Sequence, residues 1–245
     1  MQELFRWVRH TLEQPSSAPR YMQLAMILEQ GISQNKSLAG QFLPAERMIA
    51  QQLGLSRVTV SRSLALLEDK GLIVRQQGVG TRISQRLDYS LDDKGAGFTT
   101  LVLQSGGVAG NRWLERTTLL LPDEVAGHIP ALKGERVTKL RRVRLINGEP
   151  VSLETTWIPL KWLPAPEILE HSLYQYWAEQ GIIPAKKKVG IKAVACQSET
   201  ARLLNIHPGM PLLFYRQHTY NAQNGLLEYC EIYCRSDIYE IQVSD

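Results

Sequence analysis

The sequence predicts a mixed α/β chain with two domains, a small helical domain followed by an α+β domain with an antiparallel sheet. Its 245 residues exceed the usual size of one domain. Apolar residues at helical spacing dominate positions 20–71, and β-prone runs dominate the chain beyond position 98. The predicted organisation is an N-terminal extension at 1–19, a first domain at 20–84, a linker at 85–97 and a second domain at 98–245.

Composition narrows the class of protein. The hydrophobic content of 44% and the charged content of 21% are typical of soluble globular proteins. The apolar runs are far shorter than the roughly 20 residues that span a bilayer, and the N-terminus does not resemble a secretory signal. Three cysteines, an odd number, argue against a disulfide framework. We therefore expect a cytoplasmic protein without membrane association.

Charge is divided unequally along the chain. Residues 1–88 hold 11 Lys and Arg against 7 Asp and Glu, which accounts for the whole net charge of +4, and the remainder is balanced. An excess of positive charge in one domain is typical of a nucleic-acid-binding module joined to a domain with another task.

Apolar spacing predicts two helices at the start of the chain. Leu4, Val8 and Leu12 favour a short amphipathic helix in the extension, before a turn-rich segment at 14–19. From Arg20 a second apolar stripe predicts a longer helix that ends in the region 31–35.

Two further helices and a hairpin follow. Pro44 suits a helix start, Gly54 stops that helix, Ser56 caps the next one and Gly71 ends it. Two short helices joined by a glycine-containing turn are typical of the helix-turn-helix motif. Two β-prone runs then flank a glycine turn at 76–80 and predict a hairpin that would form a wing.

The start of the last helix carries the candidate DNA contacts, because this part of a helix-turn-helix enters the major groove. Arginine donates to guanine or phosphate, hydroxyls bond to either, and glycine lets the wing backbone approach DNA closely. The candidate residues are Arg47, Arg57, Thr59, Ser61, Arg62 and Gly78. The alternative interpretation is a small helical domain with ordinary surface arginines.

Several separated motifs resemble one known family. They are Leu43-Pro44-Ala45-Glu46-Arg47, Ser56-Arg57-Val58-Thr59-Val60, Leu64 with Leu66-Leu67, Gly71-Leu72-Ile73 and Gly78-Val79-Gly80-Thr81. Together they resemble the N-terminal winged helix-turn-helix of GntR regulators. The resemblance implies Arg47 and Arg57 as principal contacts, Thr59 at a phosphate and Gly78 at the wing tip. The family has arginine where this chain has Ser61, so either Arg62 takes over that contact or the operator differs there.

A single short recognition helix reads few base pairs, so specific binding normally needs two half-sites and two copies of the protein. We therefore expect a homodimer on double-stranded DNA with a near-palindromic operator. Part of its affinity should be electrostatic and should fall steeply with salt.

The second domain mixes strands with isolated helices. Strands are predicted at 112–121, 137–146, 150–158, 186–195, 212–220 and 226–234, and helices at 98–105, 165–180 and 198–205. Asn147-Gly148 between two β-prone runs is a strong hairpin signal.

Two arginines and a glutamate stand out in this hairpin. Arg142 and Arg144 share one face of a strand with apolar neighbours, where an anion would satisfy both. A solvated edge with ordinary ion pairs is an equally weighted alternative. Glu154 faces Arg141 if the loop has two residues, and faces Arg142 if the loop has three with Gly148 left-handed. Only the second register would build one polar site.

The second domain also carries a resemblance. The motifs are Arg142 and Arg144, Gly148-Glu149-Pro150, Glu154, Trp157-Ile158-Pro159, Ser172-Leu173-Tyr174, Glu199 with Leu203-Leu204, Pro208-Gly209, Pro211-Leu212, Arg216, Glu228-Tyr229, and Arg235 with Asp237 and Tyr239. From Phe98 to the C-terminus they resemble the UTRA-type effector-binding domain of the HutC branch, whose fold is similar to chorismate lyase. The resemblance implies an effector pocket lined by Phe98, Thr99, Arg142, Arg144, Glu154, Ser172 and Glu228. Cys234 stands where many members have an aromatic residue.

Effectors in this branch include sugar phosphates, amino-acid breakdown products and fatty acids, so the resemblance does not name the ligand. The arginines favour an anion such as a sugar phosphate or small carboxylate. The expected function is metabolite-responsive transcription regulation, with repression as the commoner mode in the branch.

Two rival functions are a lyase-like enzyme fused to a DNA-binding module and a constitutive architectural protein. The sequence shows no nucleophile–base pair or phosphate loop. Cys230 and Cys234, about 13 Å apart on one predicted strand, could not share a metal. We therefore expect no catalysis, no cofactor and no metal.

Overall fold

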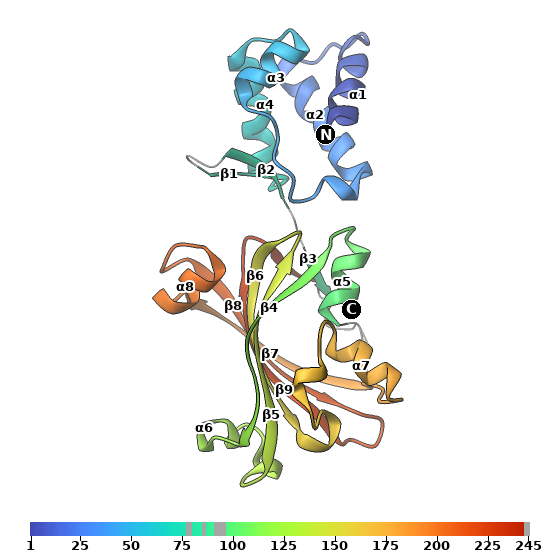
Figure 1. Cartoon of the computed structure of the whole chain (residues 1–245). Helices are drawn as coiled ribbons and strands as arrows, with labels where there is room; N and C mark the ends of the chain where they lie inside the picture. Colours follow the sequence, from blue (N-terminus) through green and yellow to red (C-terminus); the bar gives the residue numbers. More distant parts are fainter. Residues whose placement is uncertain (77–79, 85–86, 91–96, 243–245) are drawn as a thin grey trace. The chain divides into compact units, whose positions relative to one another are not determined.

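The structure of the protein is a computed structural model that describes residues 1–76, 80–84, 87–90 and 97–242. The chain divides into two compact units, Met1–Arg86 and Leu87–Asp245, and each is considered by itself (Figure 1). Among the described residues, no helix is both long enough and apolar enough to cross a membrane.

The first unit is helical with a small hairpin. Its elements are α1 (Gln2–Leu12), α2 (Arg20–Gln34), the 3₁₀ turn η1 (Lys36–Leu38), α3 (Glu46–Leu53), α4 (Arg57–Asp69), β1 (Ile73–Gln76) and β2 (Gly80–Ile83). The strands pair antiparallel, with Ile73 opposite Ile83. The predicted helix-turn-helix and wing are therefore confirmed, although the predicted wing tip at Gly78 lies outside the described residues.

The boundaries of the helix-turn-helix follow from local chemistry. Gly54 adopts a φ of 65° after α3, a left-handed conformation that costs little without a Cβ. Ser56 then caps α4, because its Oγ accepts a hydrogen bond from the backbone N–H of Thr59 at 3.1 Å. Buried Val60, Leu64 and Leu67 hold the same helix against the core of the unit.

The second unit is built on an antiparallel sheet with the strand order β4-β5-β6-β9-β8-β7. Its elements are β3 (Leu87–Ser90), α5 (Phe98–Gln104), β4 (Ala109–Leu120), α6 (Asp123–Ala126), η2 (Pro130–Leu132), β5 (Arg136–Ile146), β6 (Glu149–Pro159), η3 (Leu160–Trp162), η4 (Pro166–Ile168), α7 (Leu173–Glu179), β7 (Lys186–Ala195), α8 (Ser198–Leu204), β8 (Pro211–Tyr220), β9 (Leu226–Arg235) and β10 (Tyr239–Gln242). All six strands that were predicted from the sequence are present.

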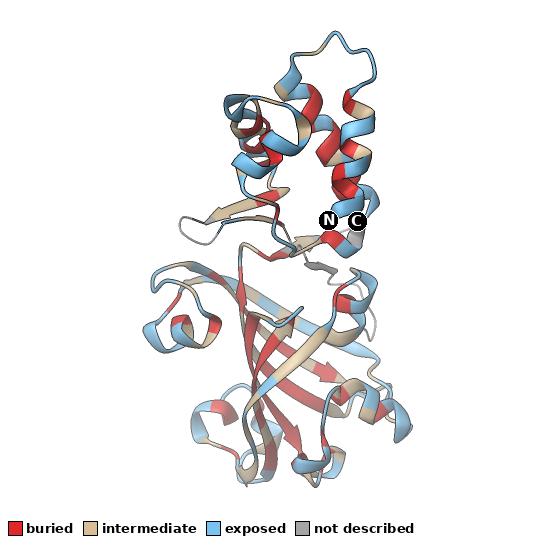
Figure 2. Cartoon of the chain, turned by 45° about the horizontal axis from the view of Figure 1, so that its top comes forward, coloured by how far each residue is buried: buried red, intermediate tan, exposed pale blue. Residues whose placement is uncertain are grey.

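Helices cover both faces of this sheet. α5 and α7 lie on one side, and α6 and α8 lie on the other (Figure 1). Val102 of α5 belongs to one hydrophobic cluster with Ile146 and Tyr215, whereas Leu204 of α8 belongs to another with Val143 and Leu153. The buried residues therefore concentrate along the strands (Figure 2). Alternation along each strand sends neighbouring residues to opposite faces, so one face is free to build a site under α5 and α7.

Two segments differ from the sequence-based expectation. The helix predicted at 165–180 is only α7, because Ser172 caps its start and the chain before it follows the edge of β4. There the Asn111 side chain donates to the backbone oxygen of His171 at 2.8 Å. The segment predicted as a linker contains β3, which pairs in parallel with β10; residues 85–86 and 91–96 lie outside the described residues.

Candidate effector pocket and DNA-binding helix

A cavity lies on the face of the sheet that α5 and α7 cover. Its empty space is about 550 Å³, open mouth included. The lining residues are Gly97, Phe98, Arg142, Arg144, Ser152, Glu154, Tyr174, Lys187, Tyr215, Gln217, Glu228, Cys230, Ile232, Cys234 and Tyr239. They come from strands far apart in the sequence, and from the starts of α5 and α7.

The register of the β5–β6 hairpin brings the charged residues together. Asn147 and Gly148 have φ values of 51° and 82°, so the turn has two residues, and Ile146 pairs with Glu149. Val151 is then an additional residue, and beyond this bulge Arg142 pairs with Glu154. The protein thus combines the two-residue turn of one sequence-based alternative with the strand pairing of the other.

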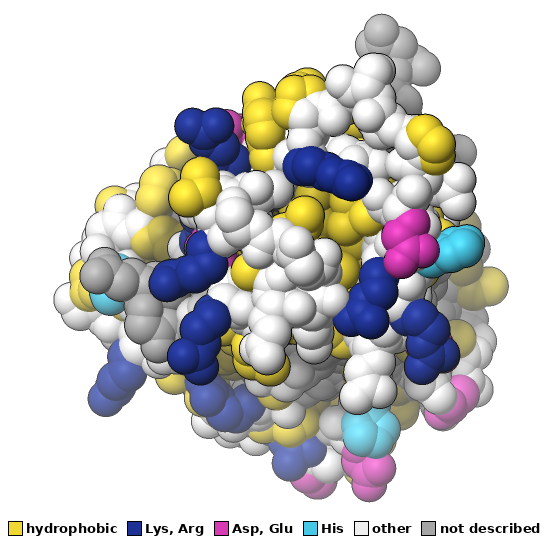
Figure 3. Space-filling model, turned by 90° about the horizontal axis from the view of Figure 1, so that it is seen from above, with side chains coloured by type: hydrophobic (Ala, Val, Ile, Leu, Met, Phe, Trp, Pro, Cys, Tyr) yellow, Lys and Arg dark blue, Asp and Glu magenta, His cyan; other side chains and the backbone are white. Residues whose placement is uncertain are grey.

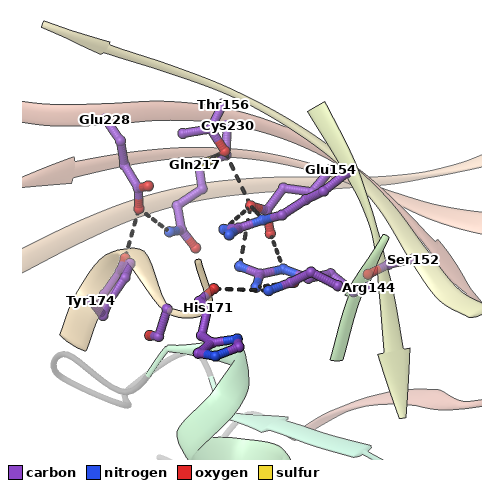
Figure 4. A network of polar contacts seen from close by, with 12 residues as sticks. Arg144, Ser152, Glu154, Thr156, His171, Tyr174, Gln217, Glu228 and Cys230 are labelled. Atoms are coloured by element: carbon purple, nitrogen blue, oxygen red, sulfur yellow. Dashed lines mark hydrogen bonds and ion pairs between the residues drawn. The ribbon is translucent and has the colours of Figure 1, made fainter. Parts of the chain in front are cut away.

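Arg142, Arg144 and Glu154 form a compact charged cluster, in which Arg144 and Glu154 are labelled in Figure 4. Arg142 donates to Oε1 of Glu154 from Nε at 2.8 Å and from Nη2 at 2.5 Å. Arg144 donates from Nε to Oε2 at 2.9 Å, and its Nη1 donates to Asn111 at 2.9 Å. The guanidinium of Arg144 also lies 4.9 Å from the centre of the Phe98 ring, and that of Arg142 lies 5.0 Å from the Trp113 ring.

Burial strengthens the electrostatic interactions within this cluster. Arg142, Arg144 and Glu154 are 1%, 7% and 6% exposed, so water screens them little. Burial by itself would raise the pKa of Glu154, but the two arginines and their hydrogen bonds lower that pKa to about 2. Burial and the neighbouring Arg144 lower the pKa of Arg142 to about 10, opposed by Glu154. Arg142 and Glu154 are therefore both charged at neutral pH.

A second polar cluster occupies the other end of the cavity (Figure 4). Oε1 of the buried Glu228 accepts hydrogen bonds from Tyr174 at 2.7 Å, from Thr219 at 2.9 Å and from Gln217 at 3.4 Å. Burial and the carboxylate of Glu228 hold the pKa of Tyr174 well above its usual range, so its hydroxyl remains a donor. Burial and the carboxylate of Glu228 also hold the pKa of the neighbouring Cys230 thiol well above its usual range.

The structure brings together five of the seven residues that the sequence places in an effector pocket. Phe98, Arg142, Arg144, Glu154 and Glu228 all line the cavity, while Thr99 and Ser172 are not among its lining residues. Ser172 instead caps α7, where its Oγ accepts the backbone N–H of Gln175 at 3.2 Å.

Sequence reasoning missed other residues of the cavity. Tyr174 belongs to the Ser172-Leu173-Tyr174 motif but was not among the predicted pocket residues, and Lys187 comes from a segment with no local signal. Lys187 Nζ lies 5.5 Å from the centre of the Tyr174 ring. Alternation along β8 offered a signal for Gln217. Gln217 and Thr219 are two residues apart, so their side chains lie on the same face of the strand, and there Gln217 donates a hydrogen bond to Thr219. Cys230 and Cys234, expected in a core, form part of the cavity wall, where burial holds their pKa values well above the usual range.

The other candidate site is the exposed start of α4. Arg57 and Arg62 are exposed there, as is Arg47 at the start of α3, while Thr59 and Ser61 are half-buried. The Thr59 hydroxyl lies 2.9 Å from the capping hydroxyl of Ser56. Figure 3 shows that Lys and Arg side chains are spread over the end of the molecule seen there, with few acidic ones.

One exposed residue of α4 was absent from the sequence-based candidates. Val58 is 64% exposed in the first turn, between Arg57 and Thr59. Its position in the helix could have identified it. Val60 and Leu64 mark the buried face of α4, and Val58 lies in the first turn on the opposite face, which must be exposed to solvent.

Comparison with known proteins agrees with this architecture. Residues 20–83 match the model of "Bacterial regulatory proteins, gntR family", and residues 104–240 match the UTRA domain. The HTH-type transcriptional regulator GgaR of Escherichia coli (strain K12) is 29% identical over 223 residues, covering 91% of this chain and 90% of that protein. The HTH-type transcriptional repressor NagR of Bacillus subtilis (strain 168) is 28% identical over 234 residues, covering 93% and 95%.

The fold is also found in a solved structure. The crystal structure of PhnF from Mycobacterium smegmatis superposes with a TM-score of 0.63 at 24% identity, covering 90% of this chain and 98% of that one. The curated relatives are transcription regulators, which favours regulation over the lyase-like enzyme. The chain belongs to the GntR family of bacterial transcription regulators, in its HutC branch, with a DNA-binding helix-turn-helix and a C-terminal UTRA effector-binding domain.

Proposed function

We propose that this regulator is a repressor that binds a near-palindromic operator as a homodimer and changes its DNA affinity when a small anion enters the cavity. Two relatives are named repressors, NagR and the mannosyl-D-glycerate transport/metabolism system repressor MngR of Escherichia coli (strain K12). The effector must bind the DNA-competent and DNA-incompetent states unequally, since only such a difference shifts their balance.

The observation that carries the effector proposal is the excess of positive charge in the buried cluster. Arg142 and Arg144 share the single carboxylate of Glu154, which leaves one positive charge uncompensated within the cluster. Nη1 of Arg142 is buried without a hydrogen-bond partner among the described groups. A buried charge without a counterion is costly, and a phosphate or carboxylate matches the arginine fork. An anion beside these arginines would supply both the missing counterion and a hydrogen-bond acceptor for Nη1 of Arg142.

The far end of the cavity supports a ligand that is more than a simple anion. Glu228 is buried and lines the cavity at that end. A carboxylate in this position accepts hydrogen bonds from hydroxyl or amine groups. The proposed effector is therefore an anion whose other end carries hydroxyls or an amine, such as a sugar phosphate or a hydroxylated carboxylate.

The DNA-binding proposal uses the exposed start of α4. Arg47, Arg57 and Arg62 would contact bases or phosphates, together with Thr59 and Ser61 and with Gly78 at the wing tip. One such helix covers too few base pairs for a specific site, so two copies are proposed to read half-sites about one helical turn, or a multiple of it, apart.

A thermal-shift screen of sugar phosphates and hydroxylated carboxylates tests the effector proposal. A ligand should raise the Tm of the wild-type protein, since binding only the folded state stabilises it. Arg144→Ala should lose this response, and Arg144→Lys should weaken it, because lysine keeps the charge without the fork. Arg136→Ala, which removes an exposed arginine from the same strand, is the matched control. An unchanged response in Arg144→Ala would refute the anion site.

Selection from a random DNA pool tests the operator proposal. The enriched sequence should be an inverted repeat, and Arg57→Ala should abolish its preference over random DNA while the protein stays folded. Lys70→Ala removes a charge that Glu29 pairs at 2.5 Å and should bind as the wild type does. A single unrepeated site bound by one protomer would contradict the dimer.

A further inference from the structure

α1 lies outside the matched range 20–83, yet it is part of the helical unit. Its Leu4, Phe5, Val8 and Leu12 are buried in the core that contains α2, α3 and α4. The approach to α2 is so close that a Cβ on Gly31 would lie 2.5 Å from Cδ1 of Leu4. The helix is thus a fixed element, and its exposed side chains project from a defined surface.

Side-chain hydrogen bonds hold the connection that follows α1. Nη1 of Arg20 donates to the backbone oxygen of Leu12 at 2.8 Å, and Nε2 of Gln23 donates to that of Gln14 at 3.3 Å. Both donors belong to α2, so the end of α1 is tied to the helix that it packs against. Groups fixed in this way lose little entropy when they bind a partner.

The cations of this unit fall into two classes. Lys70 pairs with Glu29, and Arg75 lies 3.5 Å from Glu46 and 3.4 Å from Glu68. Within the described part of the unit, Arg6 and Arg9 of α1 have no acidic partner, and neither do the candidate DNA contacts Arg47, Arg57 and Arg62. The arginines of α1 therefore share their uncompensated charge with the residues proposed to bind DNA.

The position of Arg9 connects α1 to the helix-turn-helix. Its Nη2 donates to the backbone oxygen of Gln52, near the end of α3 and four residues before the Ser56 cap of α4. Arg6 and Arg9 border a shallow groove that Pro44 and Gln52 complete from the α3 side. Both arginines are exposed. They extend the uncompensated charge beyond the α3–α4 pair.

We infer that α1 is an accessory DNA-binding surface, in which Arg6 and Arg9 contact backbone phosphates next to those reached by α3 and α4. The inference rests on the proposed reading of DNA by α4. Phosphate contacts position a protein on DNA and carry no base information. Each half-site is therefore wider than the helix-turn-helix alone requires, with an outer part where charge matters and sequence does not.

The test is the salt dependence of binding to the operator selected by the wild-type protein. Each phosphate contact contributes about 1 to the slope of log affinity against log salt concentration. Arg6→Ala with Arg9→Ala should lower that slope by about 2 per protomer and weaken binding at least tenfold at low salt. The sequence preferred in a random pool should stay the same.

Two variants separate charge from folding. Arg6→Lys with Arg9→Lys keeps both charges and should retain most of the slope. Arg6→Ala alone should fold normally, because Arg6 has no hydrogen bond or ion pair among the described residues, and should still lower the slope by about 1 per protomer. Lys70→Ala is the control, since Glu29 already neutralises that charge.

The outcomes distinguish this inference from the proposed function. Unchanged slopes in both alanine variants, with specific binding intact, would overturn the role of α1 alone. A changed sequence preference would show that α1 reads bases, which also overturns a phosphate-only surface. A wild-type protein without any sequence preference would instead refute the reading of an operator by α4.

Discussion

Arg142 donates to one oxygen of Glu154 through both Nε and Nη2, and Arg144 donates to the other oxygen from Nε at 2.9 Å and to the first from Nη2 at 3.2 Å. Glu154 is therefore the counterion of two buried guanidinium groups. A carboxylate in that role organises the cavity before any ligand is present, because each arginine is held in one orientation by a charged hydrogen bond.

The first prediction concerns the counterion itself. Glu154→Gln keeps the size of the side chain but leaves two buried positive charges without compensation, so we expect a loss of about 3–5 kcal/mol in the free energy of unfolding. Added phosphate should recover part of this loss in urea melts. Glu199→Gln is the control, because Glu199 pairs with Arg141 on the exposed surface. Equal stability of the two variants would contradict the role of Glu154.

The second prediction follows from the lowered pKa of Glu154. Since that pKa is about 2 in the folded protein against an ordinary 4.5, the unfolded chain binds the proton more readily between these values. The carboxylate then contributes about 3 kcal/mol of stability above pH 4.5, which is lost as pH falls toward 2.

Urea melts of the wild type and Glu154→Gln at several pH values measure this contribution. The difference in the free energy of unfolding should be constant from pH 7 to pH 5 and should shrink below pH 4.5. A difference in the free energy of unfolding that grows as pH falls would contradict the lowered pKa of Glu154.

The third prediction concerns the attachment of α1. Gly31→Ala places a methyl group against Leu4 and Trp7, so we expect overpacking to cost about 1–3 kcal/mol of stability. Combining Gly31→Ala with Leu4→Ala should cost less than the sum of the two single changes, because the second makes room for the first. Chemical denaturation of the four proteins measures this coupling. Strict additivity would mean that α1 does not pack on α2 as described.

The fourth prediction concerns Val58, whose side chain is 64% exposed at the start of α4. The only apolar group that bases present in the major groove is the methyl group of thymine. We therefore expect one thymine in each half-site whose replacement by deoxyuridine weakens binding by roughly fivefold, as burial of a methyl group contributes about 1 kcal/mol. Val58→Ala should bind both DNAs alike. If no thymine shows the effect, Val58 does not read a base.

Much of the architecture was predictable because it depends on neighbours in the sequence. Gly54, Ser56 and Gly71 mark helix ends through their own backbone and capping preferences, so the helix-turn-helix could be placed closely. Alternation likewise places Arg142 and Arg144 on one face of β5.

The candidate site was predictable only in part. Tyr174 and Lys187 line the cavity through the positions of α7 and β7, and the residues next to Lys187 do not indicate this. Ser172 has a role that its neighbours explain, the capping of α7, and this role places its hydroxyl on the backbone of Gln175. The prediction of a longer helix at 165–180 was wrong because side chains of β4 bind the backbone oxygens of residues 169–171, between the 3₁₀ turn η4 and α7.

The sequence by itself determined the helices and hairpin of the first unit, the six strands of the large sheet, the face on which residues of those strands lie and the excess of positive charge in the first third of the chain. The helices and strands follow from periodicity and capping, which depend on residues a few positions apart. The charge excess follows from composition alone. Only the tertiary structure decided that Glu154 faces Arg142, since the bulge at Val151 shifts the pairing after an ordinary two-residue turn. A single additional residue in one strand changes which side chains meet, and its place depends on how both strands pack against the rest of the sheet.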